Sequence, residues 1–198
     1  MTDFSPNPAE QAFLELGYNR FLDLYKEVDS AGFWEQPPSY RFHRIRDVFA
    51  IYDELTNYVA IAHILATRQQ ARPVEHDLGE RLFSFIRNLL AHFPLFDNWN
   101  DVWIDQQLAT WERTAQIHKF LSDFDGKPQE KFRFYDTAKK QMLYVAICYP
   151  TGYLQNRRIR LAEILPEHEG VRFSIRLMLG ILLRNVDDPE QILAELRA

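Results

Sequence analysis

Proline and glycine divide the first two thirds of the chain into long segments, and within each segment apolar residues recur at helical spacing. The breaks lie near Gly32, at Pro73, at Pro94 and at Pro128. Proline inside a helix removes a backbone donor and clashes with the preceding turn, so helices end close to these positions. The pattern predicts four helices: one from residue 7 to the Gly32 break, one over 40–70, one over 75–92, and one from residue 98 or 100 to 124.

Two of these helix ends carry strong local signals. The run Asn7-Pro8-Ala9-Glu10 combines an N-cap residue, a proline at the first helical position and a glutamate that can close a capping box. At the end of the third segment, Pro94 disfavours the α conformation at Phe93. We therefore expect the first helix to begin directly after Asn7 and the third to stop close to His92.

Four long helices with short connections indicate a mainly α fold, an antiparallel helical bundle. A length of 198 residues suits a single domain over residues 1–198. Within it we expect a four-helix core at residues 7–124 and a C-terminal extension at 129–198 that packs on the core.

The extension does not have one clear periodicity. The alternation of residues 171–181 is typical of a strand, yet Val171, Ile175 and Leu179 also fit one helix face. Residues 132–146 fit a helix, whereas 132–134 followed by 141–148 could form a hairpin. We favour helices, because the glycine-rich turns that strands usually need are missing. A small β element between residues 130 and 182 remains the alternative.

Composition indicates a folded protein of a reducing compartment. Apolar residues make up 46% of the chain, which is enough for a large core. The lone Cys148 cannot form an internal disulfide. The N-terminus does not resemble a signal peptide, and the longest apolar runs are far too short to cross a bilayer. We expect a cytoplasmic protein without a membrane partner.

Charge is unevenly distributed along the chain. The net charge is −5, yet residues 131–184 carry 10 basic and 4 acidic side chains, against 12 and 20 in residues 1–130. Polyanions respond to local patches rather than to net charge. Arg157, Arg158 and Arg160 are therefore candidate RNA-binding residues, with ion pairing to the acidic part of the chain as the equally weighted alternative.

One short segment carries recognisable chemistry. The residues Arg87-Asn88-Leu89-Leu90-Ala91-His92 place an arginine, a polar residue and a histidine at the end of the third expected helix. The segment resembles the R-x4–6-H signature of the HEPN ribonucleases, in which Asn often follows the Arg. The resemblance covers about residues 7–124, where it implies a HEPN-like four-helix core. A second R-x4-H match, Arg113 to His118, lacks the Asn and lies in the middle of an expected helix, so we do not assign it a function.

The residue types suit cleavage of RNA. A histidine can transfer protons near neutral pH, and an arginine can stabilise the charge on a phosphorane. The RNA 2′-hydroxyl is the nucleophile, so neither a metal nor a cofactor is expected. One histidine per chain does not make an acid–base pair. The resemblance implies a homodimer in which His92, Arg87 and Asn88 of two chains form one site.

The resemblance thus implies a metal-independent endoribonuclease of the toxin or phage-defence type, with RNA as substrate and an antitoxin protein as a further partner. Counting along antiparallel helices places Glu54 or Asp53 level with His92, where either carboxylate could orient the imidazole. The main alternative function is a non-catalytic HEPN-like module that binds RNA, nucleotide or a partner protein. A purely structural role for the motif would leave Arg87 paired with a carboxylate and His92 capping its helix. A third possibility is a plain dimeric scaffold, with Arg87 and His92 in unrelated salt bridges.

An aromatic run follows the motif directly, from Phe93 through Phe96 and Trp99 to Trp103. These rings could stack on bases. Burial is the favoured interpretation, either in the core or against a second copy of the chain, because large aromatic residues dominate cores and interfaces.

Overall fold

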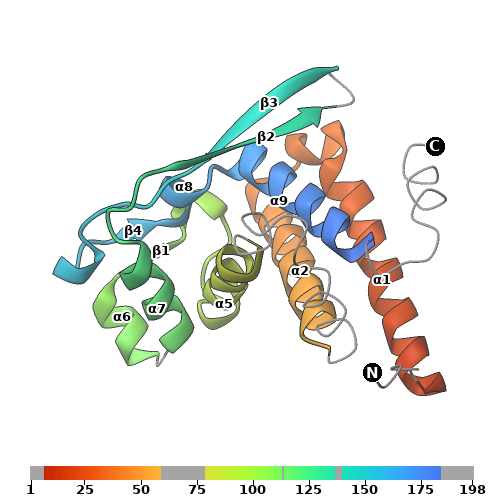
Figure 1. Ribbon diagram of the computed structural model, residues 1–198, viewed down its shortest axis with the longest axis horizontal. Helices are drawn as coiled ribbons and strands as arrows, with labels where there is room; N and C mark the ends of the chain where they lie inside the picture. Colours follow the sequence, from red (N-terminus) through yellow and green to blue (C-terminus); the bar gives the residue numbers. More distant parts are fainter. Residues whose placement is uncertain (1–6, 59–78, 113, 137–139, 184–198) are drawn as a thin grey trace, which may run out of the picture.

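The computed structural model describes residues 7–58, 79–112, 114–136 and 140–183. In this part of the chain the protein is mainly helical, with two small antiparallel β-sheets of two strands each (Figure 1). The predicted mainly α fold is confirmed. The longer sheet lies along one side of the helices and extends away from the helical body, whereas the shorter sheet lies among the helices (Figure 1).

The N-terminal helix α1 (Pro8–Asp29) begins as predicted. The Asn7 side chain accepts a hydrogen bond from the Glu10 backbone at 3.0 Å, and the Glu10 carboxylate accepts one from the Asn7 backbone at 2.8 Å. A 3-10 turn, η1 (Ala31–Glu35), then leads into α2 (Pro38–Asn57), which packs beside α1.

Helix α2 is shorter than predicted. It ends at Asn57, because Tyr58 adopts an extended conformation, with φ −64° and ψ 128°, and its amide bonds to the Leu55 carbonyl. The prediction of one continuous helix to residue 70 is therefore wrong at Tyr58. The remainder of that segment and the predicted break at Pro73 lie outside the described residues.

The third predicted helix is confirmed at its C-terminal end. A turn of π-helix, η3 (Gly79–Phe83), continues directly into α5 (Ser84–His92). Phe93 leaves the helix with φ −119° and ψ 66°, and its amide still bonds to the Leu89 carbonyl. The proline at position 94 thus has the effect expected from the sequence.

The fourth predicted helix is wrong over most of its length. The segment forms a 3-10 turn, η4 (Trp99–Asp101), a two-residue strand, β1 (Trp103–Ile104), and two short helices, α6 (Gln106–Trp111) and α7 (Ala115–Phe124). Asp105 explains the late helix start, because its side chain caps α6 by accepting from the Leu108 amide at 2.8 Å. A strand therefore interrupts the core that we expected to be purely helical.

Beyond Pro128 the structure forms the hairpin that the sequence offered as the alternative. Strand β2 (Glu130–Asp136) pairs antiparallel with β3 (Gln141–Ile147), so the preference for helix over residues 132–146 is wrong. Phe132 and Phe134 pack on Phe173, at 5.3 and 6.1 Å between ring centroids. This packing gives the alternating residues of the hairpin a buried face.

The chain then passes through η5 (Tyr153–Gln155), β4 (Ile159–Arg160) and α8 (Leu161–Ile164) into the long helix α9 (Glu167–Leu182). Strand β4 pairs with β1, which joins the C-terminal part to the earlier segment. Helix α9 confirms the helical interpretation of residues 171–182. It packs against α1, α2 and β3, and most of its residues are buried.

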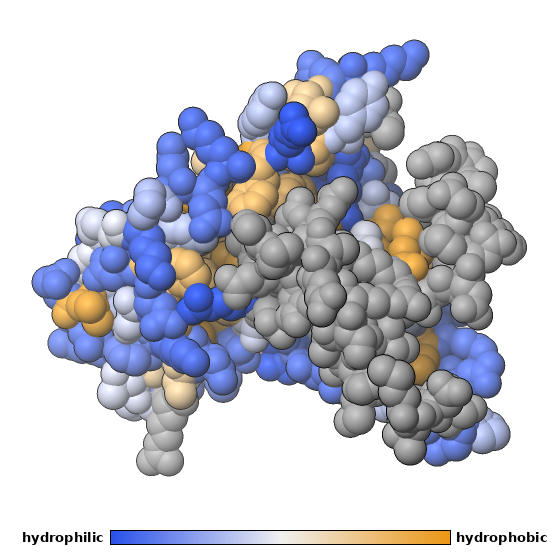
Figure 2. Space-filling view, viewed as in Figure 1, coloured by the Kyte–Doolittle hydropathy of each residue, from blue (hydrophilic) through white to orange (hydrophobic). Residues whose placement is uncertain are grey.

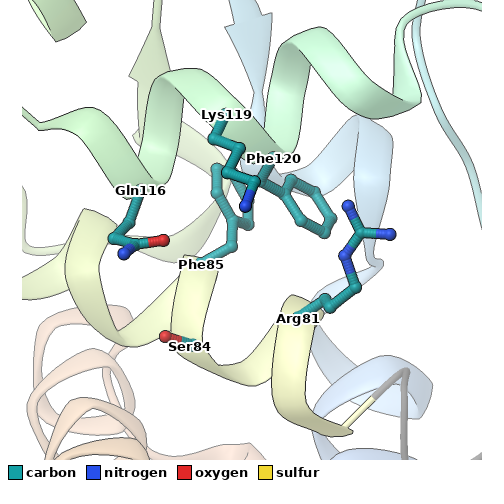
Figure 3. Close-up of a pocket in the computed structure, with 6 residues that line it drawn as sticks. All are labelled: Arg81, Ser84, Phe85, Gln116, Lys119 and Phe120. Carbon is teal, nitrogen blue, oxygen red and sulfur yellow. The ribbon is translucent and has the colours of Figure 1, made fainter.

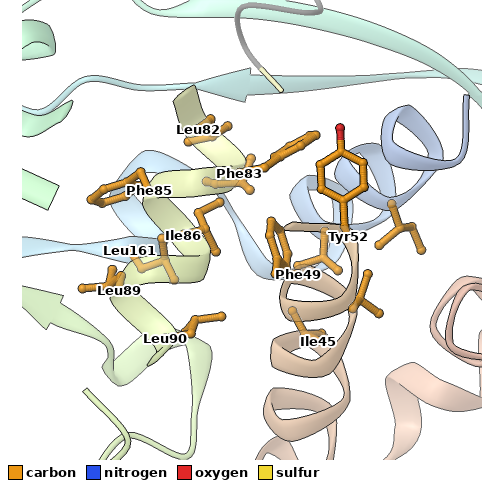
Figure 4. Packing of buried hydrophobic residues seen from close by; sticks show 14 of the residues in the cluster. Ile45, Phe49, Tyr52, Leu82, Phe83, Phe85, Ile86, Leu89, Leu90 and Leu161 are labelled. Atoms are coloured by element: carbon orange, nitrogen blue, oxygen red, sulfur yellow. The ribbon is translucent and has the colours of Figure 1, made fainter. Parts of the chain in front are cut away.

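A common core joins the two halves of the chain (Figure 4). The rings of Phe49 and Tyr52 on α2 meet the edge of Phe83, at 5.8 and 5.7 Å between centroids. The buried face of α5 adds Ile86 and Leu89. This packing fixes the position of α5 against α2, and with it the position of the Arg87–His92 segment.

On the face seen in Figure 2, hydrophilic residues predominate among the described residues, and apolar residues form small separate groups. Within the described ranges no helix combines the length and the apolar character that crossing a membrane requires.

Candidate functional site

Helix α5 carries the Arg87–His92 segment, and Arg87 lies on the side of α5 that faces α2. Arg87 forms an ion pair with Asp53 of α2, with 3.2 Å between Nε and Oδ2. Its Nη1 also donates to the Asn88 Oδ1 at 3.0 Å, and the Asn88 amide donates to the Ser84 hydroxyl at 3.4 Å. Arg87 and Asn88 are therefore held in place by neighbouring side chains, as a positioned binding group requires.

His92 is the last residue of α5 and is exposed. Within the described part of the chain, its imidazole has no hydrogen-bond or ion-pair partner. The side chain is thus free to meet a substrate or a second protein chain.

The carboxylate predicted to orient His92 contacts Arg87 instead. Asp53 is largely buried, with its side chain 16% exposed. Burial raises the pKa of its carboxyl above the usual value of 3.8, and the Arg87 guanidinium opposes that rise. Glu54, the other candidate, is exposed and lines a surface hollow with Asn7 and Tyr58 near the start of α1.

The register between the two helices explains this difference. The end of α5 lies level with Arg46 and Asp47 of α2, whereas Asp53 lies level with Arg87. Our count along the helices assumed that α2 continues to residue 70. Since α2 ends at Asn57, the residues opposite His92 come from an earlier turn of α2.

A cavity of about 300 Å³ lies between the two helices near the C-terminal end of α5, and we call it the α2–α5 cavity. Its lining is formed by Arg46, Asp47, Ala50, Arg87, Leu90, Ala91 and Pro94. Arg46 is half-buried and has no ion-pair partner among the described residues. Two arginine residues, one from each helix, therefore line this cavity, and His92 is not among its lining residues.

The sequence reasoning did not single out Arg46. Residues 46, 50 and 53 are spaced at four and three positions, so they share the face of α2 that meets α5. That spacing was visible in the sequence. Its relation to the motif depended on the register between the two helices, which the sequence did not supply.

The histidine of the second R-x4-H match has a different environment. The His118 Nδ1 lies 3.1 Å from the Tyr153 hydroxyl, and its Nε2 lies 3.4 Å from the Ser122 hydroxyl. Burial, with a further contribution from Asp105, raises the pKa of Tyr153 to about 12. The phenol therefore stays protonated near neutral pH and can donate to Nδ1. Arg113 lies outside the described residues.

Two of the three candidate RNA-binding arginines have acidic partners. Arg157 pairs with Glu163 at 2.6 Å, and Arg158 lies 3.8 Å from Asp105. The Arg158 guanidinium also lies over the Trp103 ring, 4.0 Å from its centroid. The Arg160 side chain is exposed. The alternative to RNA binding that we weighed for these arginines was ion pairing with acidic residues. Arg157 and Arg158 form such pairs.

The aromatic run after the motif is mainly internal. Phe93 and Trp99 are buried, and the Trp99 indole donates to the Leu165 carbonyl at 3.0 Å. Phe96 and Trp103 are half-buried and meet edge to face, at 6.3 Å between centroids. Leu95, which lies between them in the sequence, is 96% exposed. The apolar group available for contact beside His92 is therefore Leu95.

Comparison of the chain with protein-family models, with curated proteins and with solved structures gives no match. In the described ranges, no three side chains of the His, Cys, Asp and Glu types are grouped so that they could hold a metal ion.

Proposed function

We propose that the protein is a metal-independent endoribonuclease whose active site is completed by a second copy of the chain. The observation that carries the proposal is that α5 bears both the exposed His92 at its end and one wall of the α2–α5 cavity, which Arg46 and Arg87 line. Phosphodiesters are recognised by guanidinium groups, and histidine is the side chain best suited to proton transfer near neutral pH.

The chemistry needs only the side chains of this region and the RNA itself. The 2′-oxygen attacks the neighbouring phosphorus, and its proton passes to one imidazole that acts as base. The bond from phosphorus to the 5′-oxygen then breaks, and a second, protonated imidazole gives that oxygen its proton. Arg87 and Arg46 stabilise the negative charge of the phosphorane. The products end in a 2′,3′-cyclic phosphate and a 5′-hydroxyl.

A second chain supplies the second imidazole. His92 lies at the end of α5, is exposed, and is followed by the exposed Leu95. A symmetric contact at this end of α5 would bring two His92 side chains and two Arg87 side chains to one groove.

The resemblance of the Arg87–His92 segment to the HEPN motif supports this proposal. The four-helix core that the resemblance implied for residues 7–124 is not formed, because β1 and two short helices stand in place of the fourth helix. A role as a toxin or in phage defence, with an antitoxin as partner, belongs to the same proposal and has its support in the motif alone.

The proposal is tested by RNA cleavage with purified variants in the presence of EDTA. We expect His92→Ala to lower the cleavage rate at least about a hundredfold, as for a lost general acid or base. Arg87→Ala should lose a similar amount, because the phosphorane loses its guanidinium. His43→Ala is the matched control, since His43 is an exposed histidine on α2. Full activity in His92→Ala, or cleavage abolished by EDTA, would refute the mechanism.

A second candidate is a non-catalytic module that binds RNA through the same cavity. It is favoured by the ion pair with Asp53, which already satisfies much of the Arg87 charge. On this alternative, the wild type would bind RNA without cleaving it, and Arg46→Ala would weaken binding while His92→Ala would not.

A further inference from the structure

A second cavity lies on another side of α5, against α7, and has a volume of about 190 Å³ (Figure 3). We call it the α5–α7 cavity. It is lined by Arg81, Ser84 and Phe85 from η3 and α5, and by Gln116, Lys119 and Phe120 from α7. Its residues are separate from those of the α2–α5 cavity, and no function has been assigned to them above.

The polar groups of this cavity come from both walls. Arg81 and Ser84 extend from one wall, and Gln116 and Lys119 from the opposite one (Figure 3). The rings of Phe85 and Phe120 stack between them, at 4.3 Å between centroids, and are buried. The two rings form an apolar floor beneath these polar groups.

Arg81 is held in a fixed position. Its Nη2 pairs with Asp123 at 2.6 Å, and its guanidinium lies over the Phe124 ring, 4.4 Å from the centroid. An arginine has five N–H donors, so this pair leaves several donors free. Lys119, by contrast, is exposed and has no carboxylate partner among the described residues. With the Arg81 charge balanced by Asp123, Lys119 gives the cavity an excess positive charge.

Ser84 supplies a further donor. Its Oγ accepts a hydrogen bond from the Asn88 amide at 3.4 Å, so the hydroxyl proton remains available for another acceptor. Donors from Arg81, Lys119, Ser84 and Gln116 thus approach the cavity from different directions. This arrangement suits a tetrahedral oxyanion, which presents acceptors on all sides.

We propose that the α5–α7 cavity binds a phosphate group. That phosphate can belong to a mononucleotide or to an RNA strand, and the cavity recognises the group common to both. Asn88 bonds both to Ser84, on the wall of this cavity, and to Arg87, on the wall of the other. The RNA case rests on the proposed function, because one strand would then cross α5 between the two cavities. The mononucleotide case is independent of it.

The test is an amide NMR titration of the full chain carrying His92→Ala, so that RNA stays intact. The probes are inorganic phosphate, adenosine 5′-monophosphate and a short RNA, with acetate as the planar anion. We expect saturable shifts at the Ser84, Gln116 and Lys119 amides. Lys119→Ala should weaken phosphate binding about fivefold, the upper end of the range for one exposed ion pair. Lys119→Arg should retain most of the affinity, since the cation is kept.

Lys26→Ala is the matched control, because Lys26 is an exposed lysine on the distant helix α1. It should leave every dissociation constant unchanged. Lys119-dependent binding of the mononucleotide assigns the site to a small ligand, and Lys119-dependent binding of RNA alone assigns it to the strand. Shifts that are absent, or unaltered by Lys119→Ala, would overturn the proposal. If the wild type did not cleave RNA, the ribonuclease proposal would fail, but the phosphate titration would be unaffected. The two proposals can therefore be refuted independently.

Discussion

Asp53 and Arg87 are the two residues whose coupling can be tested most directly. Their ion pair links the buried side of α2 to the motif on α5. Because burial raises the pKa of Asp53, the folded protein holds this proton more tightly than the unfolded chain does. Stability from this group is therefore fully present below the ordinary carboxyl pKa, and it is lost as the pH rises through the higher pKa of the folded state.

We predict that replacing Asp53 with Asn removes this pH dependence. The contribution of Asp53 should fall as the pH rises through the window just above 3.8, so the stability of Asp53→Asn relative to the wild type should increase over the same window. In Arg87→Ala the window should extend to higher pH, because the cation that lowers the Asp53 pKa is gone. Urea denaturation between pH 4 and pH 7, at about half-unit steps, gives the free energy of unfolding of the wild type, Asp53→Asn and Arg87→Ala. Parallel pH profiles for wild type and Asp53→Asn would contradict the assignment.

His118 tests the choice between the two Arg–His pairs. We predict that His118→Ala leaves RNA cleavage within a few-fold of wild type, because its imidazole bonds to Tyr153 and Ser122 rather than facing the α2–α5 cavity. The same change should lower the free energy of unfolding by about 1 kcal/mol, since the buried Tyr153 hydroxyl loses its partner. Tyr153→Phe added to His118→Ala should recover part of that loss. Cleavage abolished by His118→Ala alone would mean that the functional pair is Arg113–His118.

At the level of elements, the loop before β4 sets the positions of Arg157 and Arg158. Gly152 has φ +97°, and the Asp125 carboxylate accepts from its amide at 2.8 Å. A Cβ on Gly152 would lie 3.2 Å from Cδ of Arg157. Both the backbone conformation and the close approach therefore require glycine at this position.

We predict that Gly152→Ala lowers the free energy of unfolding by about 1–2 kcal/mol, the cost of a left-handed conformation for a residue with a Cβ. Gly32→Ala is the matched control, because a Cβ at Gly32 would contact nothing within 4 Å. That change should be neutral or slightly stabilising, as the unfolded chain loses freedom. Chemical denaturation of both variants gives the comparison. Equal stabilities would show that the Gly152 loop can relax without loss.

The elements also differ in how far the sequence determines them. The start of α1 and the end of α5 depend on neighbouring residues, the Asn7–Glu10 capping box and Pro94, and both were predicted correctly. Residues 98–124 and 130–147 have apolar patterns that fit more than one structure. There the outcome depends on distant partners, such as the Leu165 carbonyl that receives the Trp99 indole and the Phe173 ring that covers the hairpin. Spacing alone cannot supply such contacts.

In the candidate site, too, the features set by neighbouring residues were predicted, and those that depend on distant contacts were not. Arg87, Asn88 and His92 were recognised from their spacing along one helix. Arg46 and the pairing of Asp53 with Arg87 depend on how α2 lies against α5, and this register follows from the end of α2 at Asn57. The Asp105 cap was the one local signal in the sequence that would have separated the fourth segment into shorter helices.

For the whole molecule, the surface near His92 decides whether one chain or two form the site. Phe93 and Trp99 are buried within the chain, so they are unavailable to a second copy. The exposed Leu95 and the half-buried Phe96 remain next to the end of α5. A symmetric dimer through this end would cover Leu95 and bring both motifs together, whereas a monomer would leave a single imidazole for two proton transfers.

We predict that Leu95→Asp converts a dimer into a monomer and abolishes cleavage together, although Leu95 has no role in the chemistry. A carboxylate at the centre of an apolar contact must be desolvated without a partner, which costs several kcal/mol across the two copies. Leu16→Asp is the matched control, since Leu16 is 70% exposed on α1, away from α5. Light scattering at micromolar concentration reports the mass, and cleavage is assayed on the same samples. If the wild type were a monomer that cleaves RNA at full rate, the two-chain site would be wrong, and a single His92 would have to serve both transfers with water.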